Sequence, residues 1–151
     1  MNNPRALFFD TSILVACFNS NPTENKIADQ AFEYADKYPH AARLTVSSCL
    51  VELFYKVRKT VAPKDVQTGL KALNIELCAI DDNMEQSLFD LYCAVAYKNE
   101  FDFADFCLCS TALMFNPVEI LTMDKNDLSL AMARAHSVSP FKSAFHLRPF
   151  P

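Results

Sequence analysis

Four acidic residues lie in segments that are otherwise apolar, and they are the first candidates for chemistry. Asp10 interrupts the apolar stretch LFFDTSILVA, and Asp124 directly follows the apolar run VEILTM. Asp105 falls on the largely apolar face of a predicted helix, where an acid is uncommon without a partner. Glu52 lies in VSSCLVELFYKVRK, where a solvated ion pair with Lys56 is an equally good explanation. Because a carboxylate in apolar surroundings costs free energy, we expect Asp10 to have a compensating partner.

Carboxylates that converge on one place cannot all remain ionised without help. Two unit charges about 4 Å apart repel by about 4 kcal/mol at an effective dielectric constant of about 20. Either the pKa values of the acids rise or cations bind between them. Hard carboxylate oxygen ligands favour magnesium or manganese over zinc. Two such ions about 3.5–4 Å apart are a common device for the attack of water on a phosphodiester.

The segments that hold these acids alternate between two patterns. Short apolar runs are typical of buried strands, and apolar residues three and four positions apart are typical of helices. The patterns predict strands at 6–9, 42–46, 75–80, 118–123 and 143–149, and helices at 12–19, 22–37, 47–60, 63–73, 82–97, 103–115 and 127–136. Strands that alternate with helices predict a parallel sheet covered on both faces. We therefore expect an α/β/α sandwich with a central, mainly parallel sheet of four to five strands.

The first residues of the helices and the last residues of the strands give two further expectations. The expected helix caps are Ser47 or Ser48, Asp81 or Asp82, Asp102, and Asn126 or Asp127. In a parallel α/β sheet the functional site lies beyond the carboxyl ends of the strands. Asp10 and Asp124 follow two of these strands directly, so we expect them to project from the same edge of the sheet.

Length and composition fit one globular domain over residues 1–151, with 51% hydrophobic and 21% charged residues. The net charge of −4 argues against a protein that coats nucleic acid, whose surface would be strongly basic. Gly69 is the only glycine, which excludes glycine-rich phosphate loops. We recognise no signal peptide and no apolar run long enough to span a membrane, so we expect a cytoplasmic protein whose six cysteines are buried free thiols.

The ordered motifs resemble the PIN-domain family of nucleases over nearly the whole chain. The stretch LFFDTSILV is similar to the opening strand of the family, and VSSCLVELFYKVRK to the helix that carries its conserved Glu. The stretch FDFADFCLCSTAL is similar to the segment around the third acid, and ILTMDKNDL to the closing T-x-D segment. Within the family, the size and motif order are most similar to the VapC-type toxins of bacterial and archaeal toxin–antitoxin pairs.

The resemblance implies roles for particular residues. Asp10, Glu52, Asp105 and Asp124 would be the catalytic acids, and the three aspartates would bind one or two Mg²⁺ or Mn²⁺ ions. The implied auxiliary residues are Thr11, Ser12, Thr122, Asn126, Asp127 and Asp102. Whether Asn126 or Asp127 assists the site stays open. Lys56, Arg58 and Lys59 are candidates for contacts with RNA phosphates, although a solvated helix face explains them equally well.

The implied function is that of a metal-dependent endoribonuclease, the toxin of a type II toxin–antitoxin pair. Its partners would be an RNA substrate such as tRNA, a cognate antitoxin and a second copy of the chain. One alternative is a PIN-like scaffold, catalytically weak or inactive, that binds RNA or protein; another is a solitary ribonuclease without an antitoxin. Two other α/β classes with acidic sites fit less well: haloacid-dehalogenase-like phosphotransferases need an acid where Ser12 stands, and receiver domains need an acidic pair after the first strand.

Overall fold

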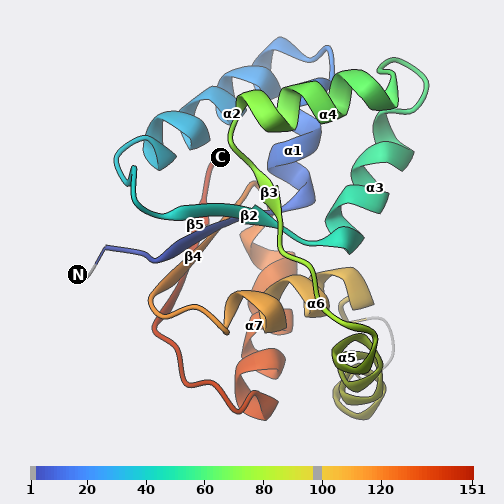
Figure 1. The fold of residues 1–151 in the computed structure, drawn as a ribbon, viewed down its shortest axis with the longest axis vertical. Helices are drawn as coiled ribbons and strands as arrows, with labels where there is room; N and C mark the ends of the chain where they lie inside the picture. The colour runs from blue at the N-terminus through green and yellow to red at the C-terminus, as the bar shows by residue number, and fades with distance from the viewer. Residues whose placement is uncertain (1–2, 97–99) are drawn as a thin grey trace.

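A computed structural model describes residues 3–96 and 100–151 of the protein, and these residues form five strands and seven helices (Figure 1). The strands are β1 (Ala6–Phe9), β2 (Ala42–Thr45), β3 (Glu76–Leu77), β4 (Val118–Thr122) and β5 (Phe145–Pro149). The helices are α1 (Thr11–Phe18), α2 (Pro22–Ala35), α3 (Ser47–Val57), α4 (Pro63–Ala72), α5 (Asp82–Val95), α6 (Phe103–Ala112) and α7 (Lys125–Val138). The alternation of strands and helices is thus confirmed.

The strands form one sheet in the order β3-β2-β1-β4-β5, and every pairing in it is parallel. The central strand β1 pairs with β2 on one side and β4 on the other, so that Ala6 lies opposite both Ala42 and Val118. All four residues of β1 are buried, as expected for a central parallel strand covered on both faces. The fold is an α/β/α sandwich with a five-stranded parallel sheet.

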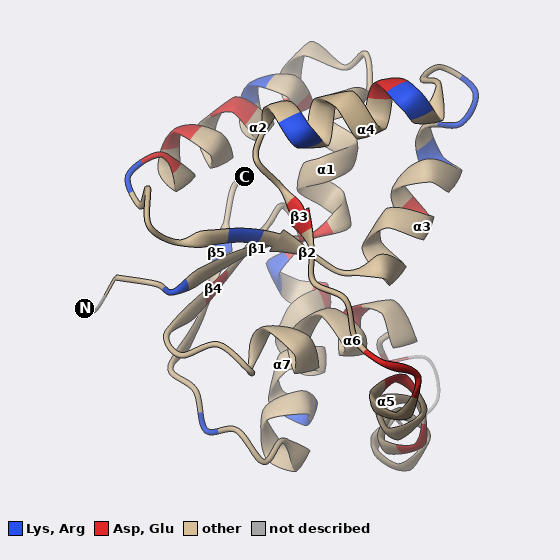
Figure 2. Ribbon diagram, viewed as in Figure 1, with Lys and Arg blue, Asp and Glu red and all other residues tan. Residues whose placement is uncertain are grey.

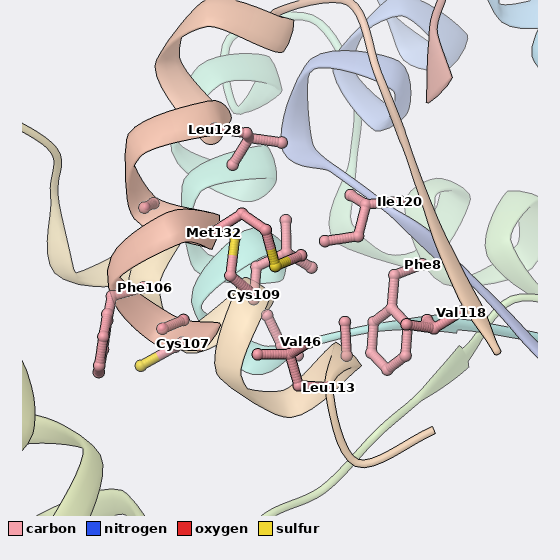
Figure 3. Close-up of a cluster of buried hydrophobic side chains, with 14 of the residues drawn as sticks. Phe8, Val46, Phe106, Cys107, Cys109, Leu113, Val118, Ile120, Leu128 and Met132 are labelled. Carbon is pink, nitrogen blue, oxygen red and sulfur yellow. The ribbon is translucent and has the colours of Figure 1, made fainter. Parts of the chain in front are cut away.

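Alternate residues of β1 divide the core into two clusters, one on each face of the sheet. Leu7 and Phe9 pack with apolar residues of α1, α2, α3 and α4. Ala6 and Phe8 pack on the other face with residues of α5, α6 and α7 (Figure 1). Figure 3 shows Phe8 among the side chains of this second cluster. The two clusters hold the helices against the sheet and so fix where each helix begins.

Two helix starts differ from the predictions. The residue at the N-cap of α3 is Val46, which makes no side-chain capping bond, so the expected cap at Ser47 or Ser48 is wrong. Helix α7 begins at Lys125, directly after Asp124, so Asn126 and Asp127 lie in its first turn and do not cap it. In both cases the helix starts two or three residues after the last residue of the preceding strand.

The capping predictions for α5 and α6 are confirmed. The side chain of Asp81 accepts a hydrogen bond from the backbone N–H of Met84, and that of Asp102 accepts one from the N–H of Asp105, both at 2.8 Å. Helix α5 ends at Val95, whereas Tyr97, its predicted end, lies outside the described residues. A further short strand was expected at 75–80, but β3 covers only Glu76–Leu77 at the edge of the sheet.

Two other features of the sequence have a clear place in the fold. The six cysteines are free. Cys49, Cys107 and Cys109 are buried as expected, Cys17 and Cys78 are only partly buried, and Cys93 is exposed, so the expectation of a buried thiol is wrong for Cys93. At Gly69 an added Cβ atom would lie 2.6 Å from the ring of Phe18, so the glycine lets α4 approach α1 closely. None of the helices in the described part of the chain is long and apolar enough to cross a membrane.

Candidate functional site

Residues from four distant segments meet in a small pocket of about 150 Å³. Its lining residues, which define the acidic pocket, are Asp10, Thr11, Ser12, Glu52, Lys56, Asp102, Asp105, Asp124, Asp127 and Leu128. Asp10 follows β1 and Asp124 follows β4, whereas Glu52 lies in the middle of α3 and Asp105 in the first turn of α6. The pocket therefore lies at the carboxyl edge of the parallel sheet, where the sequence placed Asp10 and Asp124.

Asp10 is the most enclosed of these acids, with 7% of the residue exposed. Its Oδ1 accepts a hydrogen bond from the backbone N–H of Thr11 at 2.8 Å. Its Oδ2 accepts bonds from the hydroxyls of Ser12 at 2.9 Å and Thr122 at 2.8 Å. Burial raises the pKa of Asp10, and these three bonds oppose the rise because they stabilise the carboxylate. Ser12 and Thr122, two of the auxiliary residues that the resemblance implies, thus contact the Asp10 carboxylate through their hydroxyls, whereas Thr11 contributes its backbone.

The same two hydroxyls tie the end of β4 to the start of α1. The hydroxyl of Ser12 accepts a hydrogen bond from the backbone N–H of Met123, and that of Thr122 accepts one from the N–H of Asp124, both at 2.9 Å. The backbone N–H of Asp10 itself donates to the carbonyl of Leu121 at 3.1 Å. These bonds hold the segment after β1, which carries Asp10, beside the segment after β4, which carries Asp124, although more than a hundred residues separate the two acids in the sequence.

Asp105 is held at the rim of the pocket by the start of α6. Its backbone N–H is bonded to the capping carboxylate of Asp102, which places the two acids one turn apart. The pKa of Asp105 is raised to about 8. Burial is the largest cause, and the charges of Asp102, Asp10 and Glu52 follow. A carboxyl group in this setting takes up a proton near neutral pH unless a cation compensates its charge.

Asp124 and Asp127 form a second pair of neighbouring acids. Asp124 stands at the N-cap position of α7, yet its side chain makes no capping bond to the backbone of that helix. The pKa of Asp127 is raised, first by its hydrogen bond with the side chain of Asp124 and then by the charge of that residue. Asp127 lines the pocket, whereas Asn126 is not among its lining residues.

Lys56 brings a positive charge into the acidic pocket. Its Nζ lies 2.9 Å from Oε1 of Glu52, one helical turn earlier, and the hydrogen bond to Glu52 is the main reason why the pKa of Lys56 is raised. The predicted ion pair is therefore present, and it lies at the pocket instead of on a remote surface. Both side chains remain partly exposed, at 36% for Glu52 and 50% for Lys56, so the pair is open to exchange with a ligand.

The other two predicted phosphate contacts do not reach the pocket. Helix α3 ends at Val57, so Arg58 and Lys59 follow the helix that carries Glu52 and are not part of it. The guanidinium of Arg58 lies 3.8 Å from the ring centroid of Tyr55. Figure 2 shows basic residues at the end of α3 and on α4.

The donor atoms of the acidic pocket suit a hard divalent cation. All the acids that line it offer carboxylate oxygens, and neither His nor Cys is among the lining residues. Among the described residues, no three His, Cys, Asp or Glu side chains are arranged to hold one ion between them. By their chemistry the oxygen donors suit Mg²⁺ or Mn²⁺ better than zinc. Their placement in the described residues does not by itself form a three-ligand site for an ion.

A larger depression, the side groove, lies next to the acidic pocket, and sequence reasoning missed it. It has a volume of about 630 Å³, is mainly apolar, and is bounded by α3, the segment after β3 and α6. Glu52 and Asp102 line both cavities, so the two lie side by side. The sequence gives only a weak signal for this groove: Val51 and Tyr55 are four positions apart and directly precede Glu52 and Lys56. In the structure they are 71% and 66% exposed.

Comparison of the chain with known proteins adds no family to this description. No protein-family model matches the sequence, and neither the curated proteins nor the solved structures include a significant match. The functional interpretation therefore depends on the geometry of the acidic pocket and on the motifs that line it.

Proposed function

We propose that the protein is a metal-dependent endoribonuclease that resembles the PIN-domain nucleases. The observation that carries the proposal is the convergence of Asp10, Glu52, Asp105 and Asp124 from four separate segments into one pocket. The position of the pocket at the carboxyl edge of the sheet supports it, since that edge is where α/β folds place their sites. The raised pKa of Asp105 supports it further, because clustered acids with shifted pKa values are typical of functional sites.

In this proposal Asp10, Asp105 and Asp124 hold one or two Mg²⁺ or Mn²⁺ ions. The bound metal would supply Lewis acidity, which lowers the pKa of water and stabilises charge on the scissile phosphate. Ser12 and Thr122 keep the carboxylate of Asp10 oriented through their hydroxyl groups. Asp127 lies beside Asp124, and its hydrogen bond with the Asp124 side chain raises the pKa of Asp127. The four acids serve as ligands and bases, and none of them forms a covalent bond to the substrate.

Glu52 and Lys56 act as a pair in this proposal. Glu52 positions the attacking water, either directly or through the metal, while Lys56 neutralises part of its charge in the free protein. A phosphate oxygen of bound RNA would accept the same kind of charge-assisted hydrogen bond from Lys56 that Glu52 accepts in the free protein. Lys56 is therefore assigned the phosphate contact, and an exchange of partners would free Glu52.

The proposal is tested by incubating the purified protein with a panel of single-stranded and hairpin RNAs with and without Mg²⁺. We expect cleavage only with the metal, and a loss of at least a hundredfold in Asp10→Asn and Asp105→Asn. Asp90→Asn is the matched control, since Asp90 is exposed on α5 and bonded only to Gln86 in the described structure. Equal products from wild type and both site variants would refute the nuclease proposal, and RNA binding without cleavage would favour the scaffold alternative.

We further propose, from the size and order of the motifs, that the protein is the cytoplasmic toxin of a type II toxin–antitoxin pair. It would act as a homodimer, with tRNA or another structured RNA as its substrate and a cognate antitoxin as its inhibitor. Expression of the wild type should arrest growth, Asp10→Asn should not, and a neighbouring small open reading frame should restore growth when it is co-expressed. Active enzyme whose expression is harmless, with no such reading frame beside its gene, would instead indicate a solitary ribonuclease.

A further inference from the structure

Lys56 is the only basic side chain among the described residues that line the acidic pocket. It follows Glu52 by one turn of α3, and its Nζ lies 2.9 Å from Oε1 of Glu52. Helix α3 is fixed against the core by its buried residues Cys49, Leu53 and Val57, so the pair keeps its place at the pocket. An ammonium group is therefore held at the part of the pocket wall that Glu52 forms.

The charges of other acids in the pocket also act on this ammonium group. After the hydrogen bond to Glu52 and the charge of that residue, the charges of Asp10 and Asp102 raise the pKa of Lys56. Lys56 therefore interacts with acids from the end of β1 and the start of α6 as well as with its own helix. A metal ion brought to the same place would be repelled by the ammonium group.

Asp10 has room for one further ligand bond only. Its Oδ2 accepts the hydroxyl protons of Ser12 and Thr122, and its Oδ1 accepts one backbone N–H. A carboxylate has about four lone-pair sites, so one site remains, on Oδ1. The two hydroxyls are held in this orientation because they also accept the backbone N–H groups of Met123 and Asp124. Asp10 can therefore bind one ion through Oδ1, and it cannot bridge two ions with its two oxygens.

We propose that Lys56 takes the place of a second metal ion, so that each chain binds one divalent cation at the acidic pocket. This inference rests on the proposed function and specifies the metal content of its site. Two ions would lie about 3.5–4 Å apart and would stabilise the attacking and the leaving oxygen together. The carboxylates of Asp10 and Glu52 are poorly placed to hold such a pair, because their oxygens are committed to hydroxyl groups and to Lys56.

The ammonium group of Lys56 provides the second positive charge from its position on α3. An ammonium group has three donors, so Lys56 can bond to Glu52 and to a phosphate oxygen at the same time. A single Mg²⁺ ion keeps several waters and takes only one or two carboxylates from the protein, which agrees with the few ligand bonds that remain open. One ion and Lys56 together would thus place two cationic groups at the scissile phosphate.

The number of bound ions is measured without RNA, by titrating the metal-free full chain with Mn²⁺ in a calorimeter and by EPR. The wild type should bind one ion per chain and give the EPR signal of an isolated ion. Lys56→Gln removes the ammonium group and frees Glu52, so this variant should bind a second ion and show magnetic coupling between the two. Lys56→Arg keeps the charge and should bind one ion.

Two further variants assign the ion to the acidic pocket. Lys71→Gln is the matched control, because Lys71 is an exposed lysine of α4 that does not line the pocket, and it should bind one ion as the wild type does. Asp10→Asn should weaken Mn²⁺ binding by at least roughly tenfold. The side chain of Lys56 is 50% exposed, so its replacement should leave the fold intact, which urea unfolding checks.

RNA cleavage provides a second readout of the same inference. The rate of the wild type should rise with the first power of the free Mn²⁺ concentration before it saturates. Lys56→Gln should cleave at least roughly tenfold more slowly at low Mn²⁺, because one cationic group is missing. It should regain activity at high Mn²⁺ with a steeper concentration dependence, since a second ion then supplies that charge. Lys56→Arg should keep the concentration dependence of the wild type.

The possible results separate this inference from the proposed function. Two ions in the wild type, or one ion in both the wild type and Lys56→Gln, would overturn the role of Lys56, and metal-dependent cleavage would still support the nuclease. One ion in the wild type and two in Lys56→Gln, in a protein that cleaves no RNA, would support the role of Lys56 and refute the nuclease. A protein that binds no ion would overturn both.

Discussion

The carboxylate of Asp10 illustrates how a single buried acid is accommodated. Three donors surround it, two of them hydroxyls and one a backbone N–H, and all lie within 2.9 Å. No basic side chain is needed for this compensation, because hydrogen bonds to the charged form offset part of the desolvation. Both hydroxyls also accept bonds from the turn after β4, so they have no freedom to turn away from Asp10.

Thr122→Val tests the importance of one of these hydroxyls. The change removes the bond to Asp10 and leaves the N–H of Asp124 without an acceptor, so the free energy of unfolding should fall by about 1–3 kcal/mol. RNA cleavage should fall as well, by tenfold or more, because Asp10 and Asp124 lose their common support. Urea unfolding and a cleavage assay measure the two effects.

Thr45→Val is the control for that substitution. Thr45 is also buried, and its hydroxyl donates to the carbonyl of Phe9 at 3.0 Å, but it does not line the acidic pocket. A similar loss of stability is expected, with cleavage retained at temperatures well below unfolding. If Thr45→Val and Thr122→Val reduce cleavage equally, then the effect is one of stability, and the positioning role of Thr122 is refuted.

The start of helix α6 determines both the position of Asp105 and the charge that surrounds it. The side chain of Asp102 caps the helix, and this fixes Asp105 three residues later at the rim of the acidic pocket. The same residue raises the pKa of Asp105 by charge, second only to burial. A residue that stabilises the helix thus makes its neighbour harder to ionise.

Two substitutions of Asp102 separate these effects. Asp102→Ala should destabilise the protein by about 1 kcal/mol, because the cap of α6 is lost. Asp102→Asn retains a good capping side chain, so stability should change little, yet the pKa of Asp105 should fall as a negative charge is removed. Chemical denaturation and a ¹³C NMR titration of the Asp105 carboxyl group provide the two readouts.

Asp81→Ala provides the comparison for the capping effect, since Asp81 caps α5 with the same geometry and lies away from the acidic pocket. It should cost a similar free energy of unfolding and leave the titration of Asp105 unchanged. A pKa of Asp105 that is the same in Asp102→Asn and wild type would show that the two acids do not interact.

For the molecule as a whole, the cluster of acids makes the metal-free fold sensitive to pH. The pKa of Asp105 is about 8 in the folded protein against 3.8 for the unfolded chain, and burial also raises that of Asp10. The folded state therefore binds more protons than the unfolded state between these values. The stability that the protonated carboxyl of Asp105 gives to the folded state is fully present below about pH 3.8 and is lost as the pH rises through about 8.

We expect the metal-free protein to be less stable at pH 8.5 than at pH 5, by on the order of 2 kcal/mol. This value is below the full shift because the carboxyl of Asp105 is partly open to solvent. Asp105→Asn should flatten the dependence and raise stability at pH 8.5. Mg²⁺ should stabilise the wild type at that pH in a concentration-dependent way and have little effect on Asp105→Asn. Urea unfolding in EDTA measures the pH dependence, and urea unfolding in Mg²⁺ measures the effect of the metal. Stability that rises with pH in EDTA would contradict the expected pH dependence.

The sequence was sufficient for the order of the elements and for the edge at which the site forms. Apolar runs such as ALFF and VEILT are buried in any parallel sheet, and the acids that follow them must lie where those strands end. The capping roles of Asp81 and Asp102 could also be predicted, because they depend on residues three positions away. The boundaries of α3, β3 and α7 could not, since tertiary pairing decides where an element stops.

Only the tertiary structure decided which candidate side chains share a pocket. It placed Asp127 there instead of Asn126, and Lys56 instead of Arg58 or Lys59. It also revealed the side groove, whose walls come from α3, the segment after β3 and α6. The physical reason is the distance along the chain over which each feature is determined. Helix periodicity, caps and strand burial arise from neighbours within a turn or two, whereas a cavity arises from surfaces far apart in the chain, which only the packed sheet brings together.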